Sequence, residues 1–371
     1  MLAAGLAALA VAVSSLSAST ASTHMLIGIY DEGVTLYDAP SASFAVFRAL
    51  HAQVIRLNLH WASVAPSRPT NPLDPNDAAY DWGPYDQAVE SASKYGLQLL
   101  LSVIDTPRWE NGGAGKNHAP RNMADLRDFA LAAATRYSGT WTTTSGARLP
   151  AVHLWAAWNE PNNPVFLQPQ YKRVHGKWVV ESAIEYAKIC EAVYAGVHAA
   201  RVSGDKVACG VTAPRGNNNP SEPRASVSPL TFLKAVHAAG LKHFDAWAHH
   251  PYPVSPSETP TTKPNSGQTI TLGNIQVLID QLTRYYGQKP IWITEYGWQT
   301  NPPDHYFGVS WSKQASYLKQ SFAIARKNPR IQLMLWFLLR DEPNIAGWQS
   351  GLETVNGKKK PSYSAFQHLP H

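Results

Sequence analysis

The segment Pro290-Ile-Trp-Ile-Thr-Glu-Tyr-Gly-Trp298 contains a short apolar run that is followed by a carboxylate, Glu295. The segment His153-Leu-Trp-Ala-Ala-Trp-Asn-Glu-Pro-Asn162 has the same pattern, and its apolar run is followed by Asn159 and Glu160. A run of about four to eight apolar residues bounded by turn residues is typical of a buried strand. A strand interior disfavours polar groups, whereas the carboxyl end of a parallel strand can open on a cleft. We therefore expect both glutamates at strand ends that face a cleft.

Apolar runs of this kind recur along the chain and alternate with helical patterns. Eight strands are predicted, at Leu26–Tyr30, Val54–Leu59, Leu97–Val103, Val152–Trp158, Lys206–Val211, Phe244–His249, Ile291–Thr294 and Gln332–Leu338. The predicted helices between them include Tyr85–Tyr95, Met123–Tyr137, Glu181–Ala200, Leu230–Ala239, Leu272–Tyr286 and Trp311–Lys327. This alternation predicts right-handed crossovers and a parallel sheet covered by helices. Eight such units close into a single α/β domain, a (β/α)8 TIM barrel over residues 24–371, with a doubly wound open sheet as the alternative.

The predicted loops differ between the two ends of the barrel. Those that enter strands are short, for example Tyr95-Gly96, whereas long segments rich in Pro, Gly and Asn follow the strands. These long segments are 110–121, 162–180, 215–229, 253–270, 299–310 and 340–357. The face at the carboxyl ends of the strands is where barrel enzymes place their chemistry, so we expect the active site there.

The composition is that of a folded protein with an unusual number of aromatic rings. Of the 371 residues, 44% are apolar and 16% are charged, which excludes a disordered chain. The 13 Trp, 16 Tyr and 10 Phe exceed what packing usually requires, so some should line a binding surface. The formal charge is +6, but no stripe of Lys and Arg appears beyond Lys358–Lys360. Nucleic acid is therefore not expected as a partner.

Residues 1–23 predict a secretory signal peptide. They carry no charge, and their apolar run from Leu2 to Leu16 is too short to span ~30 Å of hydrocarbon. Ala18 or Ala21 supplies the small residue at which such a peptide is cleaved, although the usual Lys or Arg before the run is missing. We expect a secreted protein that acts as a monomer and has no membrane attachment after cleavage.

The two cysteines, Cys190 and Cys209, fit either an oxidising or a reducing compartment. They could pair in an exported protein. Because Cys190 lies in a predicted helix and Cys209 in the next predicted strand, their geometry cannot be read from the sequence, and we expect buried free thiols. Their spacing does not indicate a metal site.

The predicted barrel also bounds the separation of Glu160 and Glu295. Eight strands about 4.8 Å apart and tilted by ~36° give a radius of about 7.5 Å, so strands three places apart face each other across roughly 14 Å. Side chains that each reach inward by about 4 Å leave roughly 6 Å between the carboxyl groups. This separation is nearer the ~5–5.5 Å of retaining glycosidases than the middle of the inverting range.

Several strand ends resemble one enzyme family in the correct order along the chain. Asn159-Glu160-Pro161 and Ile293-Thr294-Glu295-Tyr296-Gly297-Trp298 are similar to the acid/base and nucleophile strands of clan A retaining glycoside hydrolases, particularly of the family 39 and family 5 type. Four other segments agree with this family: Val54-Ile-Arg-Leu57 with Trp61, Thr106-Pro107-Arg108-Trp109, His250-Pro251-Tyr252 and Leu335-Trp336-Phe337. The resemblance covers about residues 25–366 and implies a (β/α)8 barrel that cleaves β-glycosidic bonds in a carbohydrate substrate without a cofactor or a metal.

The resemblance implies a role for each matching residue. Glu160 would be the general acid that protonates the leaving oxygen and then the base that activates water. Glu295 would attack the anomeric carbon and form the covalent glycosyl-enzyme. Asn159 would bind the sugar 2-hydroxyl, Arg56 would pair with the negative charge of Glu295, and Tyr252 would donate a hydrogen bond to the same carboxylate.

The remaining matching residues are expected to bind or surround the sugar. His250 would belong to the polar network, and its neighbour His249 would point to the opposite face of the strand. Trp336 would stack under the sugar in the reactive subsite, although alternation leaves Phe337 as the other residue that could face the lumen. Further tryptophans that could stack on pyranose faces are Trp61, Trp109, Trp298, Trp311 and Trp348.

The sequence also departs from the family pattern. Asp105 follows the third strand, where many family 5 members have a histidine, and the long segment Gln168–Val180 carries several basic residues that could overhang the leaving-group side. Substrate specificity therefore stays open. Long loops and many aromatic residues favour endo-action on an extracellular polysaccharide, with an exo-acting, β-xylosidase-like enzyme or a non-catalytic carbohydrate-binding barrel as alternatives.

Overall fold

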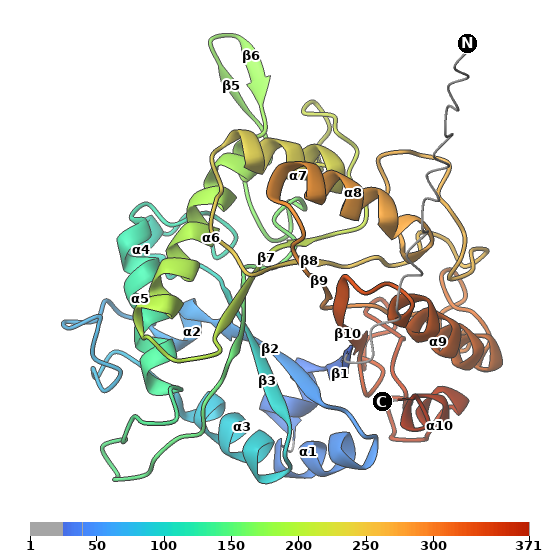
Figure 1. The fold of residues 1–371 in the computed structure, drawn as a ribbon, viewed down its shortest axis with the longest axis horizontal. Coiled ribbons are helices and arrows are strands. Elements are labelled where there is room, and N and C mark those ends of the chain that lie inside the picture. The colour runs from blue at the N-terminus through green and yellow to red at the C-terminus, as the bar shows by residue number, and fades with distance from the viewer. Residues whose placement is uncertain (1–24, 39, 371) are drawn as a thin grey trace, which may run out of the picture.

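The computed structural model describes residues 25–38 and 40–370, so the predicted signal peptide lies outside the described residues. Eight parallel strands form a closed barrel in the order β1-β2-β3-β4-β7-β8-β9-β10 (Figure 1). Their bounds are β1 Leu26–Tyr30, β2 Val54–His60, β3 Gln98–Ile104, β4 Leu154–Ala157, β7 Lys206–Thr212, β8 Ala246–His249, β9 Ile291–Ile293 and β10 Ile331–Phe337. The predicted (β/α)8 barrel is confirmed.

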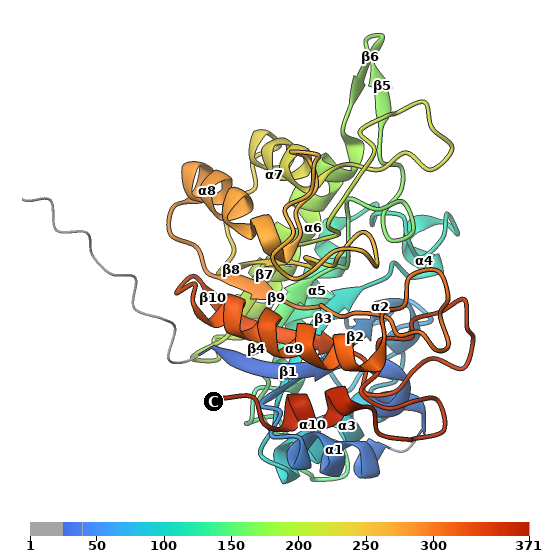
Figure 2. The same ribbon diagram turned by 90° about the vertical axis from the view of Figure 1, so that its right-hand side faces the viewer.

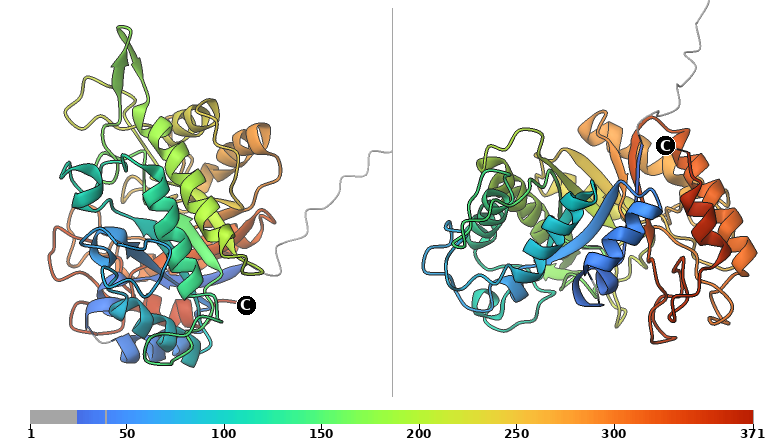
Figure 3. Two further views of the ribbon diagram at one scale, coloured as in Figure 1. Left: turned by 90° about the vertical axis from the view of Figure 1, so that its left-hand side faces the viewer. Right: turned by 90° about the horizontal axis from the view of Figure 1, so that it is seen from below.

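Helices surround the barrel, as the view from below shows (Figure 3). The α-helices are α1 Pro40–Ala49, α2 Trp61–Val64, α3 Gly83–Lys94, α4 Arg108–Asn111, α5 Met123–Arg136, α6 Glu181–Ala199, α7 Pro229–Ala238, α8 Ile275–Tyr286, α9 Trp311–Arg326 and α10 Pro361–Gln367, with a π-helix at Gly33–Asp38 and a 3-10 turn at Leu272–Asn274. In the part of the chain that the structure describes, no helix is long and apolar enough to cross a membrane.

The apolar core has two layers, separated by the barrel wall. On β10, Leu333 and Leu335 point inward and join a small cluster that fills the lumen, while Met334 and Trp336 belong to the larger cluster between strands and helices. Alternation along each strand produces this division. The same alternation decides which residues just beyond the strand ends point to the mouth of the barrel.

The predicted elements are all present, and the differences lie at their ends and in one loop. β4 ends at Ala157 rather than at Trp158, because Trp158 takes a left-handed φ of 69° and leaves the sheet. The α-helices α1, α2, α4 and α10 are additional to the predicted ones. The segment 162–180, predicted as a loop, contains a two-stranded antiparallel hairpin of β5 (Lys172–Val174) and β6 (Lys177–Val179).

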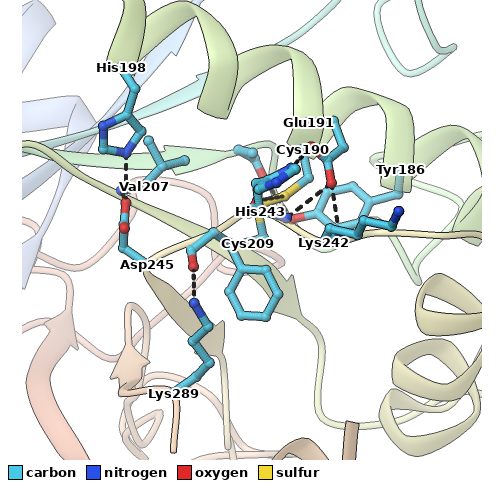
Figure 4. Close-up of a disulfide and its surroundings, with 12 residues drawn as sticks. Tyr186, Cys190, Glu191, His198, Val207, Cys209, Lys242, His243, Asp245 and Lys289 are labelled. Carbon is cyan, nitrogen blue, oxygen red and sulfur yellow. Dashed lines mark hydrogen bonds and ion pairs between the residues drawn. A yellow bond between two sulfur atoms is a disulfide. The ribbon is translucent and has the colours of Figure 1, made fainter. Parts of the chain in front are cut away.

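The expectation of free thiols is wrong, because Cys190 and Cys209 form a disulfide with a Cα–Cα distance of 6.0 Å. The helix α6 immediately precedes β7 and packs on the outer face of that strand, so Cys190 on the helix meets Cys209 on the strand (Figure 4). Both residues are fully buried. The bond therefore ties one helix to the barrel wall inside the outer core.

Candidate active site

Glu160 lies just beyond β4 on a strained stretch of backbone. Trp158 and Glu160 have φ values of 69° and 36°, a region that non-glycine residues occupy at a cost of about 1–3 kcal/mol each. Two hydrogen bonds hold this conformation, from the Trp158 N–H to the Val103 carbonyl and from the Glu160 N–H to the Val211 carbonyl, both 2.8 Å. Neighbouring strands thus fix the backbone that presents the Glu160 carboxyl group to the barrel mouth.

The surroundings of Glu160 favour its protonated form. Its side chain is 12% exposed, and burial raises the pKa of this carboxyl group to about 7. A hydrogen bond of 3.0 Å from the Asn163 amide and the more distant charge of Arg56 oppose this shift only in part. A carboxyl group with such a pKa can donate a proton and later accept one near neutral pH.

Glu295 follows β9 and has a different set of partners. Nη1 of Arg56 lies 2.7 Å from its Oε1 and forms an ion pair, and the Tyr252 hydroxyl donates a hydrogen bond of 3.0 Å to its Oε2. Burial raises the pKa of Tyr252 well above its usual range, so this hydroxyl keeps its proton. Both carboxylate oxygens of Glu295 are therefore oriented by donors that do not lose their protons near neutral pH.

Arg56 on β2 is fully buried and orients two strand ends at once. Its Nη2 donates to the Oδ1 of Asn159 at 2.7 Å, while its Nε donates to the Ser102 hydroxyl at 2.9 Å. Because a guanidinium can only donate, the amide oxygen of Asn159 must face Arg56. The amide NH2 of Asn159 is then left to donate to a ligand in the cleft.

His250 bridges the two carboxylates. Its Nδ1 lies 3.0 Å from Glu160 Oε1 and 3.6 Å from Glu295 Oε2, and its Nε2 lies 2.9 Å from the Thr294 hydroxyl and 3.3 Å from Arg56 Nη1. Burial lowers the pKa of His250 to about 3, so the ring is neutral. Since Arg56 can only donate, Nε2 is the acceptor and Nδ1 carries the hydrogen that faces the carboxylates. As expected from alternation, His249 points away and contacts Thr212.

The two glutamates lie close together across the cleft. One oxygen of Glu160, one oxygen of Glu295 and a ring nitrogen of His250 all lie within 4.8 Å of one another. This spacing agrees with the ~5–5.5 Å carboxyl separation of retaining glycosidases. Three such groups could also approach a cation, but the Arg56 guanidinium donates hydrogen bonds to two of them, Glu295 and His250, and opposes a second positive charge. The donor set fits an ionic and hydrogen-bonded pair of carboxylates better than a metal.

Trp336 does not face the lumen of the barrel, contrary to the prediction. Its side chain is fully buried on the outer side of β10, where its indole N–H donates to the Ser350 carbonyl at 2.9 Å. Because Leu335 points into the lumen, Trp336 must point out, and Phe337 returns to the lumen. Phe337 packs there against Tyr30, with ring centroids 5.3 Å apart.

Three other predicted tryptophans also lie away from the cleft. Trp61 is buried and stacks on Phe129 in the outer core, and the buried Trp298 donates its indole N–H to the Tyr296 hydroxyl. Trp109 is half-buried, and the guanidinium of Arg68 covers its ring at 4.5 Å. The structure therefore brings Arg56, Asn159, Glu160, His250, Tyr252 and Glu295 together and leaves Trp61, Trp109, Trp298 and Trp336 outside this group.

Trp348 is the tryptophan that reaches the site. It is 37% exposed, and its ring centroid lies 5.0 Å from Tyr252 and 5.3 Å from Phe337. Together with Glu160 and Tyr252 it lines a cavity of about 300 Å³. Its place in a long loop after β10 was the only signal in the sequence, and that signal did not separate it from the other strand-end tryptophans.

A second polar cluster at the barrel mouth was not predicted. His60, at the end of β2, lies 2.8 Å from Glu32 and 2.6 Å from Asp105, and each of the three side chains is about one-fifth exposed. Burial lowers the pKa of His60, but the hydrogen bonds that its ring nitrogens donate to Asp105 and Glu32 outweigh this effect and raise the pKa to about 9. The unusual Asp105 after β3 was the signal, since it provides a charged partner where a histidine was expected.

Comparison with known proteins agrees with this site. Residues 231–365 match the family model of the glycosyl hydrolase catalytic core. No curated protein matches the chain by sequence. The matched part begins in α7 and includes Tyr252, Glu295 and Trp348.

Three solved structures that share this fold are glycosidases with low sequence identity to the chain. A family 39 glycoside hydrolase from Bacteroides cellulosilyticus WH2 has a TM-score of 0.63 and 20% identity, with coverage of 92% of this chain and 62% of that chain. A glucosidase from Croceicoccus marinus has a TM-score of 0.65 and 14% identity, with coverage of 94% of this chain and 67% of that chain. A fungal β-1,4-galactanase has a TM-score of 0.59 and 14% identity, with coverage of 94% of this chain and 100% of that chain. The chain thus spans about 62% of the length of the family 39 enzyme. The predicted likeness to family 39 and family 5 enzymes is confirmed at the level of the fold.

Proposed function

We propose that the protein is a retaining β-glycosidase that works by double displacement. The observation that carries this proposal is the pair of carboxylates at the ends of β4 and β9, with oxygens within 4.8 Å of each other and with different partners. Retaining enzymes need one carboxyl group that can exchange a proton and one that can attack carbon, at about this distance. The match of residues 231–365 to a glycosyl hydrolase catalytic core supports the same assignment.

In the first step, Glu295 attacks the anomeric carbon while the bond from that carbon to the leaving oxygen breaks. Glu160 transfers its proton to the leaving oxygen, so the aglycone departs as a neutral alcohol. Tyr252 and Arg56 orient the attacking carboxylate, and the NH2 group of Asn159 is free to bind the sugar 2-hydroxyl as positive charge develops on the ring.

In the second step, water attacks the same carbon and the bond to Glu295 breaks. Glu160 is now the base that takes a proton from the water, which returns it to the protonated state. Its pKa falls at this stage because Glu295, as an ester, no longer carries a negative charge nearby. The product keeps the configuration of the substrate because the carbon has been inverted twice.

We further propose endo-action on a polysaccharide. Space continues on both sides of the aromatic group formed by Tyr252, Phe337 and Trp348, with a cavity of about 300 Å³ on the Glu160 side and one of about 330 Å³ beside Phe337. Sugar units could therefore bind on both sides of the cleaved bond, whereas exo-action requires a closed end.

Export of the protein is also a proposal. The disulfide between Cys190 and Cys209 supports it, because such bonds form and persist in oxidising compartments. Expression with a periplasmic or extracellular destination, followed by mass analysis of the recovered protein, should find the bond formed and residues near 1–23 removed.

The activity can be tested by digestion of a panel of β-linked polysaccharides and aryl β-glycosides. NMR spectra recorded during the first minutes should show the β-anomer as the initial product, and product sizes should fall through intermediate oligosaccharides. An initial α-anomer would contradict the double displacement, and release of single sugars alone would contradict endo-action. If binding occurred with no product after long incubation, the protein would be a carbohydrate-binding barrel instead.

A further inference from the structure

Two cavities adjoin on the Glu160 side of the cleft. The inner one, of about 300 Å³, is lined by Glu160, Trp348 and Arg215, and the outer one, of about 360 Å³, is lined by Tyr171 and Trp178. Both cavities share Pro164 and Arg224 in their walls. The two cavities are therefore neighbours, and together they are called the hairpin groove, which runs from the Glu160 carboxyl group outward along the loops after β4 and β7.

The outer wall of this groove is the β5–β6 hairpin. Figure 2 shows that the hairpin projects outward beyond the helices α6 and α7, and Figure 3 shows the loop 215–229 beside its base. The Tyr171 hydroxyl lies 3.5 Å from the Ser226 carbonyl and joins the two segments. The hairpin and this loop thus form opposite sides of the same path.

The hairpin presents an aromatic ring to the groove. Trp178 is 43% exposed although it is one of the largest apolar side chains, and it stands directly opposite Arg173 in the hairpin. The guanidinium of Arg173 lies over the ring, 4.9 Å from its centre. An exposed indole at the end of a groove is suited to stack on the apolar face of a sugar.

The groove is also electropositive compared with the other side of the cleft. Arg215 and Arg224 are exposed and make no ion pair with any described residue. Apart from Glu160, these two arginines are the only charged side chains among the described residues that line either cavity. By contrast, the cavity beside Phe337 is lined by four carboxylates and one arginine: Asp31, Glu32, Asp341, Glu342 and Arg340. Two of these carboxylates, Glu32 and Asp341, are paired with His60 and Lys360, which leaves Asp31 and Glu342 with Arg340. The two sides of the cleaved bond therefore differ in charge.

We propose that the hairpin groove binds the leaving-group part of a polysaccharide that carries acidic groups, with Trp178 as the distal sugar platform and Arg215 and Arg224 as the anion contacts. This proposal rests on the proposed function. The shared ligand chemistry is a carboxylate or sulfate ester on a sugar at least one unit beyond the cleaved bond. Arginine is suited to both anions because its planar fork can donate two parallel hydrogen bonds.

Binding measurements on the full chain can test this groove without turnover. In a Glu160→Gln, Glu295→Gln background, calorimetry would compare fragments of a glucuronic acid-substituted xylan with the same fragments after carboxyl reduction and with sulfated fragments of equal length. We expect the acidic fragments to bind about tenfold or more tightly than the reduced ones, with a preference that weakens as salt is added. Tighter binding of sulfated than of carboxylated fragments would assign the site to sulfate esters.

Variants then locate the contact. The double variant Arg215→Ala, Arg224→Ala should lose the preference for acidic fragments. Trp178→Ala should weaken the binding of all longer fragments, whereas Trp178→Phe should retain most of their affinity. Arg284→Ala, on the exposed side of α8, is the matched control and should change neither the preference for acidic fragments nor the affinity for longer ones. Equal affinity for acidic and reduced fragments, or an unchanged preference in the double arginine variant, would overturn the proposal. Hydrolysis of aryl glycosides by the unaltered chain decides the proposed function separately.

Discussion

Glu160 at the end of β4 and Glu295 at the end of β9 share one cleft, yet the groups that touch them differ in charge. Glu160 contacts the neutral ring of His250 and the amide of Asn163. Glu295 contacts the guanidinium of Arg56 and a tyrosine hydroxyl. Two identical side chains a few ångströms apart are thus suited to opposite tasks, one to exchange a proton and the other to carry charge.

The difference does not arise in β4 or β9 themselves. It comes from β2, which provides Arg56, and from the segment after β8, which provides His250 and Tyr252. His250 separates the two environments, because it faces both carboxylates and remains neutral between them. The different roles of the two glutamates therefore depend on four strands, β2, β4, β8 and β9, which meet at one barrel mouth.

Loss of Glu295 should have the largest effect. Glu295→Ala removes the attacking group, and we expect kcat to fall by roughly four to six orders of magnitude. Azide should restore activity in the cavity left by the side chain and should give the inverted glycosyl azide, which NMR can identify. Normal turnover by the variant would show that Glu295 is not the nucleophile.

Loss of Glu160 should have an effect that depends on the leaving group. With a poor leaving group, Glu160→Ala should lower kcat/KM by roughly 10²–10⁴, because no proton reaches the departing oxygen. With a dinitrophenyl glycoside the first step needs no acid, so kcat/KM should fall far less. Equal losses on both substrates, measured by steady-state kinetics, would contradict the acid role.

The comparison also shows how far the sequence leads. Apolar runs that end on a carboxylate are local signals, and they placed Glu160 and Glu295 at strand ends correctly. Trp336 and Phe337 are adjacent, and only the register of β10 in the closed barrel decides which of them faces the lumen. Trp348 reaches the site through a long loop, whose path no periodicity predicts.

Contacts between distant segments were the least predictable features. The ion pairs of His60 join residues from the ends of three strands, and the disulfide requires a helix and a strand to approach within 6.0 Å. Each depends on tertiary packing, because neither the spacing nor the composition of the sequence predicts which elements become neighbours. The hairpin was missed for another reason: its strands have three residues each and an alternation too short to separate from a loop.

The raised pKa of Glu160 should lower the stability of the folded protein at high pH. Its pKa is about 7 in the folded state against the usual 4.5, so stability is lost as pH rises through this interval. Glu160→Gln removes the loss and should raise the free energy of unfolding by about 3 kcal/mol at pH 8, but leave it nearly unchanged at pH 4. Denaturant unfolding at both pH values would measure this, with the exposed Glu90→Gln as control. An equal change at both pH values would indicate a packing effect instead.

The smallest change in activity should come from loss of Asn163, the hydrogen-bond partner that opposes the raised pKa of Glu160. The Asn163 amide donates to Glu160 Oε2 and lowers the pKa of that carboxyl group, so Asn163→Ala should raise this pKa further. Activity needs the protonated acid and declines as pH rises through its pKa, so the basic limb of the kcat/KM profile should move to higher pH. Asn122→Ala is a matched control, because Asn122, like Asn163, accepts from the backbone N–H two residues on, but lies at the start of α5. A basic limb that moved equally in both variants, or moved to lower pH in Asn163→Ala, would mean that Glu160 does not set it and that the contrast between the two glutamates does not govern the proton transfer.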